Sequence, residues 1–365
     1  MAHPRGDDYA SQLAKHCRAS SGNPDGQESL DALLPTRTCW TRTTSFTQVL
    51  ARTMPTVLVA TWRSGLFAYA NNTFHEEWSG QSVKGLARDS SGNALAIVGG
   101  KSLCRRMADG AWSTIATSEL ELECCVAVGA TLYVGTDDAH VMRVCDDGSF
   151  ERLGGFDHVA GRDRWYAGAA LVDGRLVGPP LGIRSMTATC NHAALLANVH
   201  VGGIPRSADG GATWQPTIDI DSDVHQVCAH PRRPEIVIAA AGVGLCISRD
   251  GGVTWTAEHE GLHASYCSAV AFAGDDILVA ASTDHFAPQG AIYRRPIDPD
   301  ALILPVGGGL PRWIEGIADT GNIAACGSAV AVADRAGNLY LSADAGRTWS
   351  CGGDRLPAPS SLFVY

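Results

Sequence analysis

The sequence predicts an all-β protein, a β-propeller of seven four-stranded blades. Three observations support this fold. One octapeptide pattern, S-x-D-x-G-x-T-W, occurs three times, at residues 207–214, 248–255 and 342–349. A strand–turn–strand pattern begins near residue 38 and continues to the end of the chain. A four-strand unit, clearest at 224–261, can be laid over the chain repeatedly, which is typical of propellers.

The octapeptide is typical of a tight hairpin turn. Its Asp and Ser or Thr oxygens can accept backbone N–H groups within the turn, and its Gly can adopt a positive φ. Its Trp begins the next strand, where an indole can pack between neighbouring sheets. We therefore expect a structural role for six residues: Asp209, Trp214, Asp250, Trp255, Asp344 and Trp349.

The four-strand unit matches the chain at seven places, and the middle strands of the matches are apolar on both faces, as expected between blades. The matches are 47–78, 83–112, 125–150, 183–214, 224–261, 266–296 and 322–349. Two further segments leave the closure of the ring open. Residues 360–365 resemble one more inner strand and residues 38–42 resemble an outer strand, so six or eight blades remain alternatives.

The domain organisation follows from these matches. Residues 1–37 are polar and weakly patterned, and we expect a flexible lead-in there. The propeller is predicted over 38–365, with an insert at about 154–182 between the third and fourth matches. An insert of this length in a compact fold is often functional.

Charge and composition indicate which partners are disfavoured and in which compartment the protein is expected. The net charge of −10 disfavours nucleic acid and anionic membranes as partners. The first residues lack the apolar stretch of a secretory signal, and no apolar run is long enough for a membrane span. The twelve cysteines are then expected to be reduced thiols, and we predict a cytoplasmic protein.

Propeller topology indicates which loops could form a site. The B–C and D–A loops share the face at which the central channel of such folds usually takes its ligand. Five histidines fall on that face: His140, His200, His225, His263 and His285. Neutral imidazoles around an axis can hold a divalent transition metal together with a carboxylate, or act as general acids and bases. The alternative is that they only cap strand ends.

We accordingly expect His200, His225 and His263 as catalytic residues, and His200, His225, His263 and His285 as metal ligands if a divalent transition metal is the cofactor. The substrate-binding residues predicted on the same face are Arg63, Arg184, Arg335 and Asp319, with Trp165 from the insert.

The octapeptides resemble the Asp-box (BNR) repeat of sialidase-like propellers. The runs GPPLGIRSM, NVHVGGIPRSADGGATW, DVHQVCAHP and EGLHASYC are similar to bacterial cytoplasmic BNR-repeat proteins, which are labelled glycosyl-hydrolase-like from their fold. The resemblance implies the propeller rather than sialidase activity. Sialidases carry an Arg-Ile-Pro motif and a Tyr/Glu nucleophile pair, whereas this chain has Ile204-Pro205-Arg206, and Tyr266 has no Glu beside it.

The expected function is the binding of a small polar or anionic ligand at a His-rich channel mouth, with hydrolase or lyase chemistry, metal-assisted or not. A second resemblance, to the Asp-box propellers that assist photosystem II assembly, implies an alternative, a non-catalytic scaffold that binds a protein. A glycosidase or sialidase is the third and least favoured reading.

Overall fold

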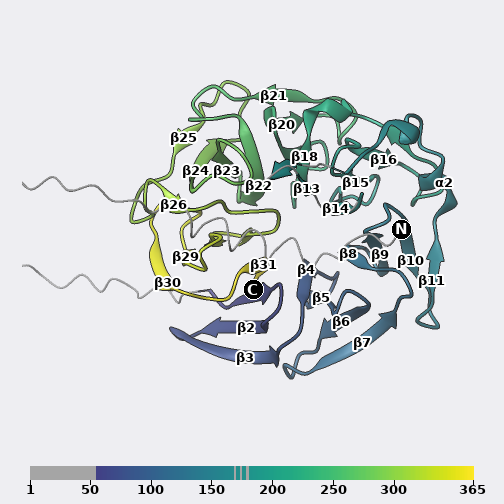
Figure 1. The fold of residues 1–365 in the computed structure, drawn as a ribbon, viewed down its shortest axis with the longest axis horizontal. Helices are drawn as coiled ribbons and strands as arrows, with labels where there is room; N and C mark the ends of the chain where they lie inside the picture. Colours follow the sequence, from purple (N-terminus) through teal and green to yellow (C-terminus); the bar gives the residue numbers. More distant parts are fainter. Residues whose placement is uncertain (1–54, 168–169, 173–174, 178–180) are drawn as a thin grey trace, which may run out of the picture. The chain divides into compact units, whose positions relative to one another are not determined.

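The computed structural model describes residues 55–167, 170–172, 175–177 and 181–365. The predicted lead-in, the strand-like segment 38–42 and the start of the first match lie outside the described residues. The described chain forms seven antiparallel sheets arranged as blades around a common centre (Figure 1). The seven-bladed β-propeller predicted from the sequence is confirmed.

Each blade contains four neighbouring strands, given below in order from the centre outward. We number the blades in chain order. Blade 1 holds β31 (Pro359–Val364), β1 (Val57–Thr61), β2 (Gly65–Ala70) and β3 (Thr73–Ser79). Blade 2 holds β4 (Val83–Arg88), β5 (Ala94–Val98), β6 (Ser102–Arg106) and β7 (Trp112–Thr117). Blade 3 holds β8 (Leu122–Val128), β9 (Thr131–Thr136), β10 (Val141–Val144) and β11 (Phe150–Arg152).

Blade 4 holds β14 (Ile183–Ala188), β15 (Leu195–Val199), β16 (Pro205–Ser207) and β17 (Gln215–Pro216). Blade 5 holds β18 (Val224–Ala229), β19 (Val237–Ala241), β20 (Gly244–Ser248) and β21 (Thr256–Glu258). Blade 6 holds β22 (Tyr266–Ala273), β23 (Asp276–Ser282), β24 (Gln289–Pro296) and β25 (Leu304–Pro305), and β26 (Ile314–Glu315) also pairs with β24. Blade 7 holds β27 (Ile323–Cys326), β28 (Ala329–Ala333), β29 (Leu339–Ser342) and β30 (Ser350–Gly353).

The ring closes inside blade 1. The last strand of the chain, β31, pairs antiparallel with β1, placing Val364 opposite Val57 and Leu362 opposite Val59. The innermost place of blade 1 is thus filled from the far end of the sequence. Of the two closing segments left open by the sequence, residues 360–365 take this role, and the count of blades is therefore seven.

The three octapeptides form the predicted turns between the third and fourth strands of blades 4, 5 and 7. In the first, Ser207 Oγ accepts a hydrogen bond from Gly211 N at 2.8 Å, and Asp209 Oδ1 accepts one from Thr213 N at 2.9 Å. The Trp214 indole donates to the carbonyl of Gly211 at 2.9 Å. The Ser and Asp contacts recur at residues 248–255 and 342–349. In the last copy Ala345 adopts the positive φ, 59°, that glycine adopts in the others.

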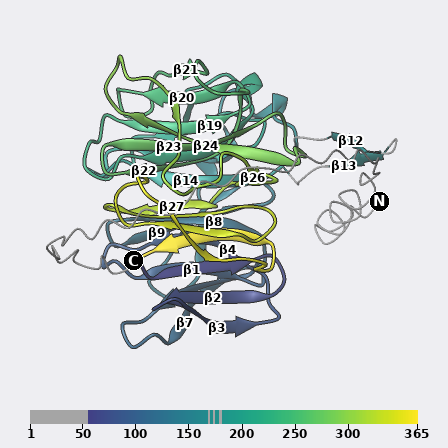
Figure 2. The same ribbon diagram turned by 90° about the vertical axis from the view of Figure 1, so that its left-hand side faces the viewer.

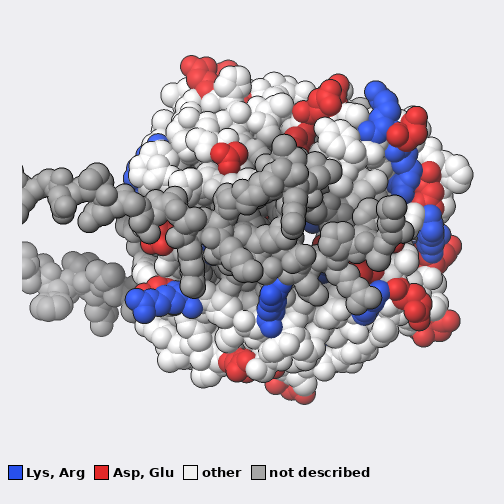
Figure 3. Space-filling model, viewed as in Figure 1, with Lys and Arg blue, Asp and Glu red and all other residues white. Residues whose placement is uncertain are grey.

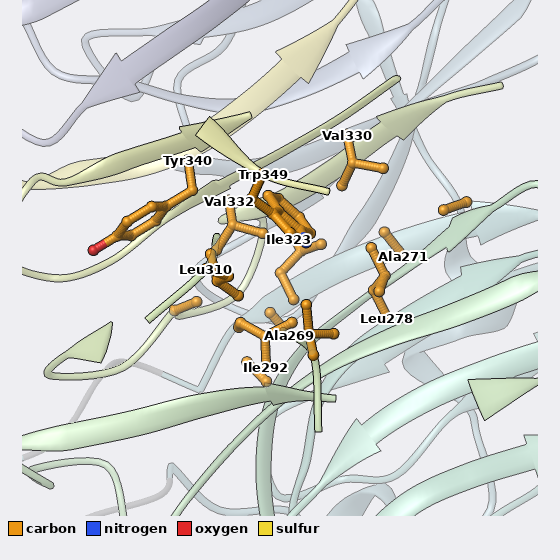
Figure 4. Packing of buried hydrophobic residues seen from close by; sticks show 14 of the residues in the cluster. Ala269, Ala271, Leu278, Ile292, Leu310, Ile323, Val330, Val332, Tyr340 and Trp349 are labelled. Carbon is orange, nitrogen blue, oxygen red and sulfur yellow. The ribbon is translucent and has the colours of Figure 1, made fainter. Parts of the chain in front are cut away.

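The core lies between the blades. The second strands, such as β1, β15 and β19, are buried along their whole length. Figure 4 shows one such interface, where Leu278 and Ile292 of blade 6 meet Val332 and Trp349 of blade 7. Each such large apolar side chain contributes about 1.5–3 kcal/mol on burial. Trp349 thereby packs between sheets, as the octapeptide pattern predicts.

Polar side chains link the innermost strands of neighbouring blades. An innermost strand has one edge without a partner strand in its own sheet, so its backbone N–H groups need other acceptors. Ser185 Oγ of β14 accepts from Val227 N of β18 at 2.9 Å, and Gln226 Oε1 of β18 accepts from Val270 N of β22 at 3.2 Å. These links hold the strand ends that carry the loops of the channel mouth.

The insert at 154–182 contains the short helix α2 (Gly154–Asp157), a 3-10 turn (Arg162–Arg164), and a hairpin of β12 (Ala170–Val172) and β13 (Arg175–Val177). The hairpin stands away from the blades in the side view (Figure 2). Within the described ranges, the structure has no helix that is both long and apolar enough to cross a membrane.

Candidate functional site at the channel mouth

A carboxylate lies between two imidazoles where blades 4 and 5 meet. His200 follows β15 of blade 4, whereas Asp223 immediately precedes β18 of blade 5 and His225 lies within it. Asp223 Oδ1 is 3.4 Å from His200 Nε2, and Asp223 Oδ2 is 3.4 Å from His225 Nε2. The two imidazole rings are 5.6 Å apart. We call His200, Asp223 and His225 the His–Asp–His cluster.

A hydrogen bond to a carbonyl decides which nitrogen of the buried His225 ring carries the hydrogen. Its side chain is 2% exposed, and Nδ1 donates a hydrogen bond to the carbonyl of Cys267 at 2.7 Å. A carbonyl can only accept, so in the neutral ring the lone pair lies on Nε2. His225 Nε2 is buried and has no hydrogen-bond partner, and His200 Nδ1 is in the same situation. The cluster therefore contains two buried ring nitrogens without a hydrogen-bond partner, and one of them, His225 Nε2, faces the carboxylate.

The backbone at Asp223 adopts a rare conformation. Its φ of 51° and ψ of 68° lie in the left-handed region, which costs a non-glycine residue about 1–2 kcal/mol. The carbonyl of Asp223 accepts a hydrogen bond from Gly242 N at 2.9 Å. A Cβ at Gly242 would lie 3.2 Å from Asp223 Oδ2, so glycine there leaves room for the carboxylate. Such strain at a cluster of ionisable groups points to a function for the carboxylate.

A second group of charges adjoins the cluster. Arg184 Nη2 lies 3.6 Å from Asp319 Oδ1 and donates to Thr320 Oγ1 at 3.3 Å. Asp319 also interacts electrostatically with His285 and Arg335, and Arg335 Nη2 contacts His285 Nε2 at 3.4 Å. Burial alone would raise the pKa of Asp319, but electrostatic interactions with Arg184, His285 and Arg335 lower it to about 2. Asp319 is therefore ionised at neutral pH and can hold guanidinium groups in place.

The imidazoles of His200 and His285 are neutral at neutral pH. Burial, followed by the nearby charges of Arg184 and His225, lowers the pKa of His200 to about 3, although Asp223 opposes the shift. Burial is also the main reason that the pKa of His285 falls to about 4, against the opposing charge of Asp319. The neutral rings offer nitrogen lone pairs that can accept a hydrogen bond or bind a metal, and the positive charge beside them belongs to Arg184 and Arg335.

The structure thus brings together six of the residues predicted from the sequence: Arg184, His200, His225, His285, Asp319 and Arg335. Of the four proposed metal ligands, only His200 and His225 belong to the set whose ligand atoms lie within 4.8 Å of one another, and the third member of that set is Asp223. In the described part of the chain this is the one such set of three or more residues.

Three predicted site residues lie elsewhere. His263 Nδ1 is 2.8 Å from the Tyr293 hydroxyl, and its ring packs edge-on against Trp313, 4.8 Å away. Trp165, predicted to bind substrate, is only 8% exposed and packs against Phe156 in the core. Its ring therefore faces neighbouring side chains rather than a ligand. Arg63 is exposed in the loop between β1 and β2 of blade 1.

Sequence reasoning missed Asp223 and Thr320. Asp223 stands two residues before His225, so the spacing D-x-H in a loop entering an innermost strand was an available signal. Thr320 gives no such signal in the sequence. Its hydroxyl donates to the backbone carbonyl of His225, 3.1 Å away and far from it in the sequence. Only the fold brings these two loops together.

Comparison with known proteins supports the fold. No protein-family model matches the chain, and no curated protein sequence matches it. A putative 6-phosphogluconolactonase from Bacteroides uniformis has a similar structure, with a TM-score of 0.56, 12% identity, and coverage of 86% of this chain and 99% of that one.

Two larger enzymes are also similar in structure. A GH74 enzyme from Niastella koreensis has a TM-score of 0.52 and 14% identity, covering 81% of this chain and 46% of its own. A GH74 xyloglucanase from Xanthomonas campestris gives 0.52 and 16%, covering 81% and 47%. The chain therefore spans about half the length of these two enzymes. At such identities the likeness concerns the fold alone.

Proposed function

We propose that the channel mouth binds a small polar or anionic ligand and processes it by hydrolase or lyase chemistry. The observation that carries this proposal is the placement of the His–Asp–His cluster beside Arg184, Asp319 and Arg335. Neutral imidazoles can act as general bases near neutral pH. Guanidinium groups present the fork of N–H donors that suits carboxylates and phosphates. The two groups together provide both recognition and proton transfer.

The residues divide into roles under this proposal. Arg184 and Arg335 anchor the negative charge of the ligand, and Asp319 positions the guanidinium groups. His225 accepts or donates protons, or binds together with His200 a metal that assists the reaction. Asp223 orients the imidazoles from between them, 3.4 Å from each. The similar structures of a putative 6-phosphogluconolactonase and a xyloglucanase agree with an enzymatic propeller but transfer no substrate to this chain.

A ligand screen tests this function. Wild-type protein is heated with a panel of small carboxylates, sugar phosphates and lactones, because a ligand that binds only the folded state stabilises it. A ligand at a hundred times its Kd adds about 2.7 kcal/mol to the free energy of unfolding. Arg184→Met should abolish the shift. Arg232→Met is the matched control. Arg232 lies on the opposite face, in the loop between β18 and β19, and pairs with Asp275.

The outcome against the proposal is equally concrete. If the panel gives no shift, or if Arg184→Met and Arg335→Met respond to the ligand as wild type does, the mouth is not the binding site proposed here.

A non-catalytic scaffold is the second candidate, and exposed aromatic residues favour it. Trp62 is 44% exposed, Trp313 40% and Phe286 38%, and all three lie in loops of the mouth face. Exposed Trp is enriched among the residues that dominate protein interfaces. Charges of both signs are mixed around the rim of the face in Figure 3, which suits a polar interface rim. A partner whose binding is lost in Trp62→Ala and Trp313→Ala, with a silent ligand panel, would favour the scaffold.

We also propose that the octapeptide turns are Asp-box (BNR) repeats in a propeller without sialidase chemistry. In support, Arg206 of the scrambled triplet donates to the carbonyl of Gly251 in the next turn at 2.8 Å, which is a structural task. A cytoplasmic location is proposed as well. The ten cysteines in the described part of the chain are all unpaired, including the adjacent, buried Cys124 and Cys125, as is usual in a reducing compartment. Neither nucleic acid nor membrane is proposed as a partner, in line with the net charge of −10.

A further inference from the structure

We propose that His200, Asp223 and His225 form a binding site for a divalent transition metal ion of the zinc type. This inference deepens the proposed function, because the ion would lie in the same mouth. Its geometric basis is nevertheless independent of any ligand. The cluster has residue types that such an ion prefers, room between them, and an outer hydrogen bond behind His225.

Spacing is the first argument. Each imidazole nitrogen is 3.4 Å from the nearer carboxylate oxygen, longer than the ordinary N–H···O distance of about 2.7–3.2 Å. An ion held tetrahedrally at about 2.1 Å from each ligand atom spaces neighbouring ligand atoms about 3.4 Å apart. The two nitrogens face different oxygens of the carboxylate, and one ligand atom of each residue lies within 4.8 Å of the others, so the three residues leave room for one ion between them.

The hydrogen bond behind His225 is the second argument. A histidine that binds metal through one nitrogen almost always donates its other N–H to a carbonyl, a carboxylate or water. His225 Nδ1 donates to the carbonyl of Cys267 at 2.7 Å, which turns Nε2 toward Asp223. That Nε2 is buried without a hydrogen-bond partner. A metal ion would satisfy it, because the lone pair would become a coordinate bond.

The backbone at Asp223 gives the third argument. Asp223 has a left-handed φ of 51° and places its carboxylate between the rings. Gly242 leaves room for that carboxylate, because a Cβ there would lie 3.2 Å from Oδ2. Strain of this kind persists only where the surrounding structure determines it.

The ligand set indicates the class of ion. Two imidazoles and one carboxylate suit zinc and its neighbours, whereas magnesium and calcium prefer oxygen ligands alone. Three protein ligands leave at least one coordination position for water or a ligand, which is typical of catalytic rather than structural zinc sites. Arg184 interacts electrostatically with His200 and Asp223, so an anionic group bound to the ion would also meet a guanidinium.

The test uses the full chain purified without a histidine tag and stripped with EDTA. Zn²⁺ alone is titrated calorimetrically, and Co²⁺ is used for its visible absorption spectrum, which reports coordination by nitrogen and oxygen. We expect about one equivalent of metal. Asp223→Asn keeps the shape of the side chain and should weaken Zn²⁺ binding at least about tenfold, as should His200→Ala.

The matched control is His263→Ala. It removes a histidine from the same face that bonds Tyr293 instead of joining the cluster, and it should bind Zn²⁺ as wild type does. Melting temperatures in EDTA show whether each variant is folded. His225→Ala is less informative, because the ring is buried and bonded to Cys267, so its loss also removes packing.

Binding of less than about 0.1 equivalent overturns the metal site, and so does unchanged affinity in both Asp223→Asn and His200→Ala. The two proposals fail separately. Zinc bound at the cluster with a silent ligand panel refutes only the ligand function. A ligand shift that EDTA leaves intact, in protein that takes up no metal, refutes only the metal site.

Discussion

Thr320 Oγ1 donates a hydrogen bond to the backbone carbonyl of His225 at 3.1 Å, and the same oxygen accepts one from Arg184. Thr320 lies in the loop that leads into blade 7, whereas His225 belongs to blade 5 and Arg184 to blade 4. One hydroxyl therefore connects three blades at the mouth. It couples the His–Asp–His cluster to the arginine that we propose as an anion anchor.

Replacing Thr320 by valine should test that connection. Thr320→Val keeps the volume but removes both hydrogen bonds, and each is worth about 0.5–1.5 kcal/mol. We expect the free energy of unfolding, measured in urea, to fall by about 1–3 kcal/mol. Thr73→Val is the control, because Thr73 is exposed at the start of β3 and bonds only the Ala70 carbonyl and the His75 ring. If the two variants unfold with equal free energies, the hydrogen bonds of Thr320 add nothing to the stability of the fold.

Adding a methyl group at Gly242 should disturb the carboxylate without unfolding the blade. The new Cβ would meet Asp223 Oδ2 at 3.2 Å, so the carboxylate must move away from the rings. We expect Gly242→Ala to weaken Zn²⁺ binding about tenfold, measured by calorimetry, with little change in melting temperature. Gly307→Ala, where a Cβ would have nothing within 4 Å, is the control. Wild-type affinity in Gly242→Ala would contradict the role given to Asp223.

The octapeptide turns should make the protein sensitive to acid. Hydrogen bonds from Thr213, Thr254 and Thr348 lower the pKa of Asp209, Asp250 and Asp344 to about 2, although burial opposes this shift at Asp250 and Asp344. A carboxyl whose pKa is lower in the folded state stabilises the fold above its unfolded pKa, and this contribution is lost as the pH falls toward 2.

The measurement is the free energy of unfolding between about pH 5 and pH 2. A triple variant with Asn at the three turn positions should be less stable than wild type at pH 5, and the difference should shrink toward pH 2. Asp300→Asn, in an exposed loop between β24 and β25, controls for the loss of a surface carboxylate. A constant difference across this range would mean that the turns do not depend on ionised Asp.

The closing strand should dominate the stability of the ring. Leu362 of β31 is 4% exposed and packs between blades 1 and 7, so Leu362→Ala should cost about 2–5 kcal/mol in urea unfolding. Leu302→Ala is the matched control, because Leu302 is 68% exposed and should change stability by less than about 0.5 kcal/mol. A small effect at Leu362 would mean that the closure of the ring adds little to its stability.

The fold was predictable because its signals are local. The octapeptide turns, the apolar second strands and the last strand are all set by residues close together in the sequence. Loop topology was also sufficient to place Arg184, His200, His225, His285, Asp319 and Arg335 on one face.

The details of the mouth were not predictable in the same way. The direction of a loop side chain depends on contacts with distant residues, as when Tyr293 holds His263 and Phe156 packs on Trp165. Asp223 likewise reaches the imidazoles only through a backbone conformation that its sequence does not favour.

The pairing of β31 with β1 has a consequence for synthesis on the ribosome. Strand β1 is made near the start of the described chain, and its partner Pro359–Val364 is the last of the described strands to be made. At about 5–20 residues per second, the edge of β1 waits about 15–60 s for that partner. Throughout that interval the nascent chain is an open arc with an unpaired, apolar strand edge, which can pair with another chain. Slow translation and limited chaperone access should therefore lower the yield of this propeller.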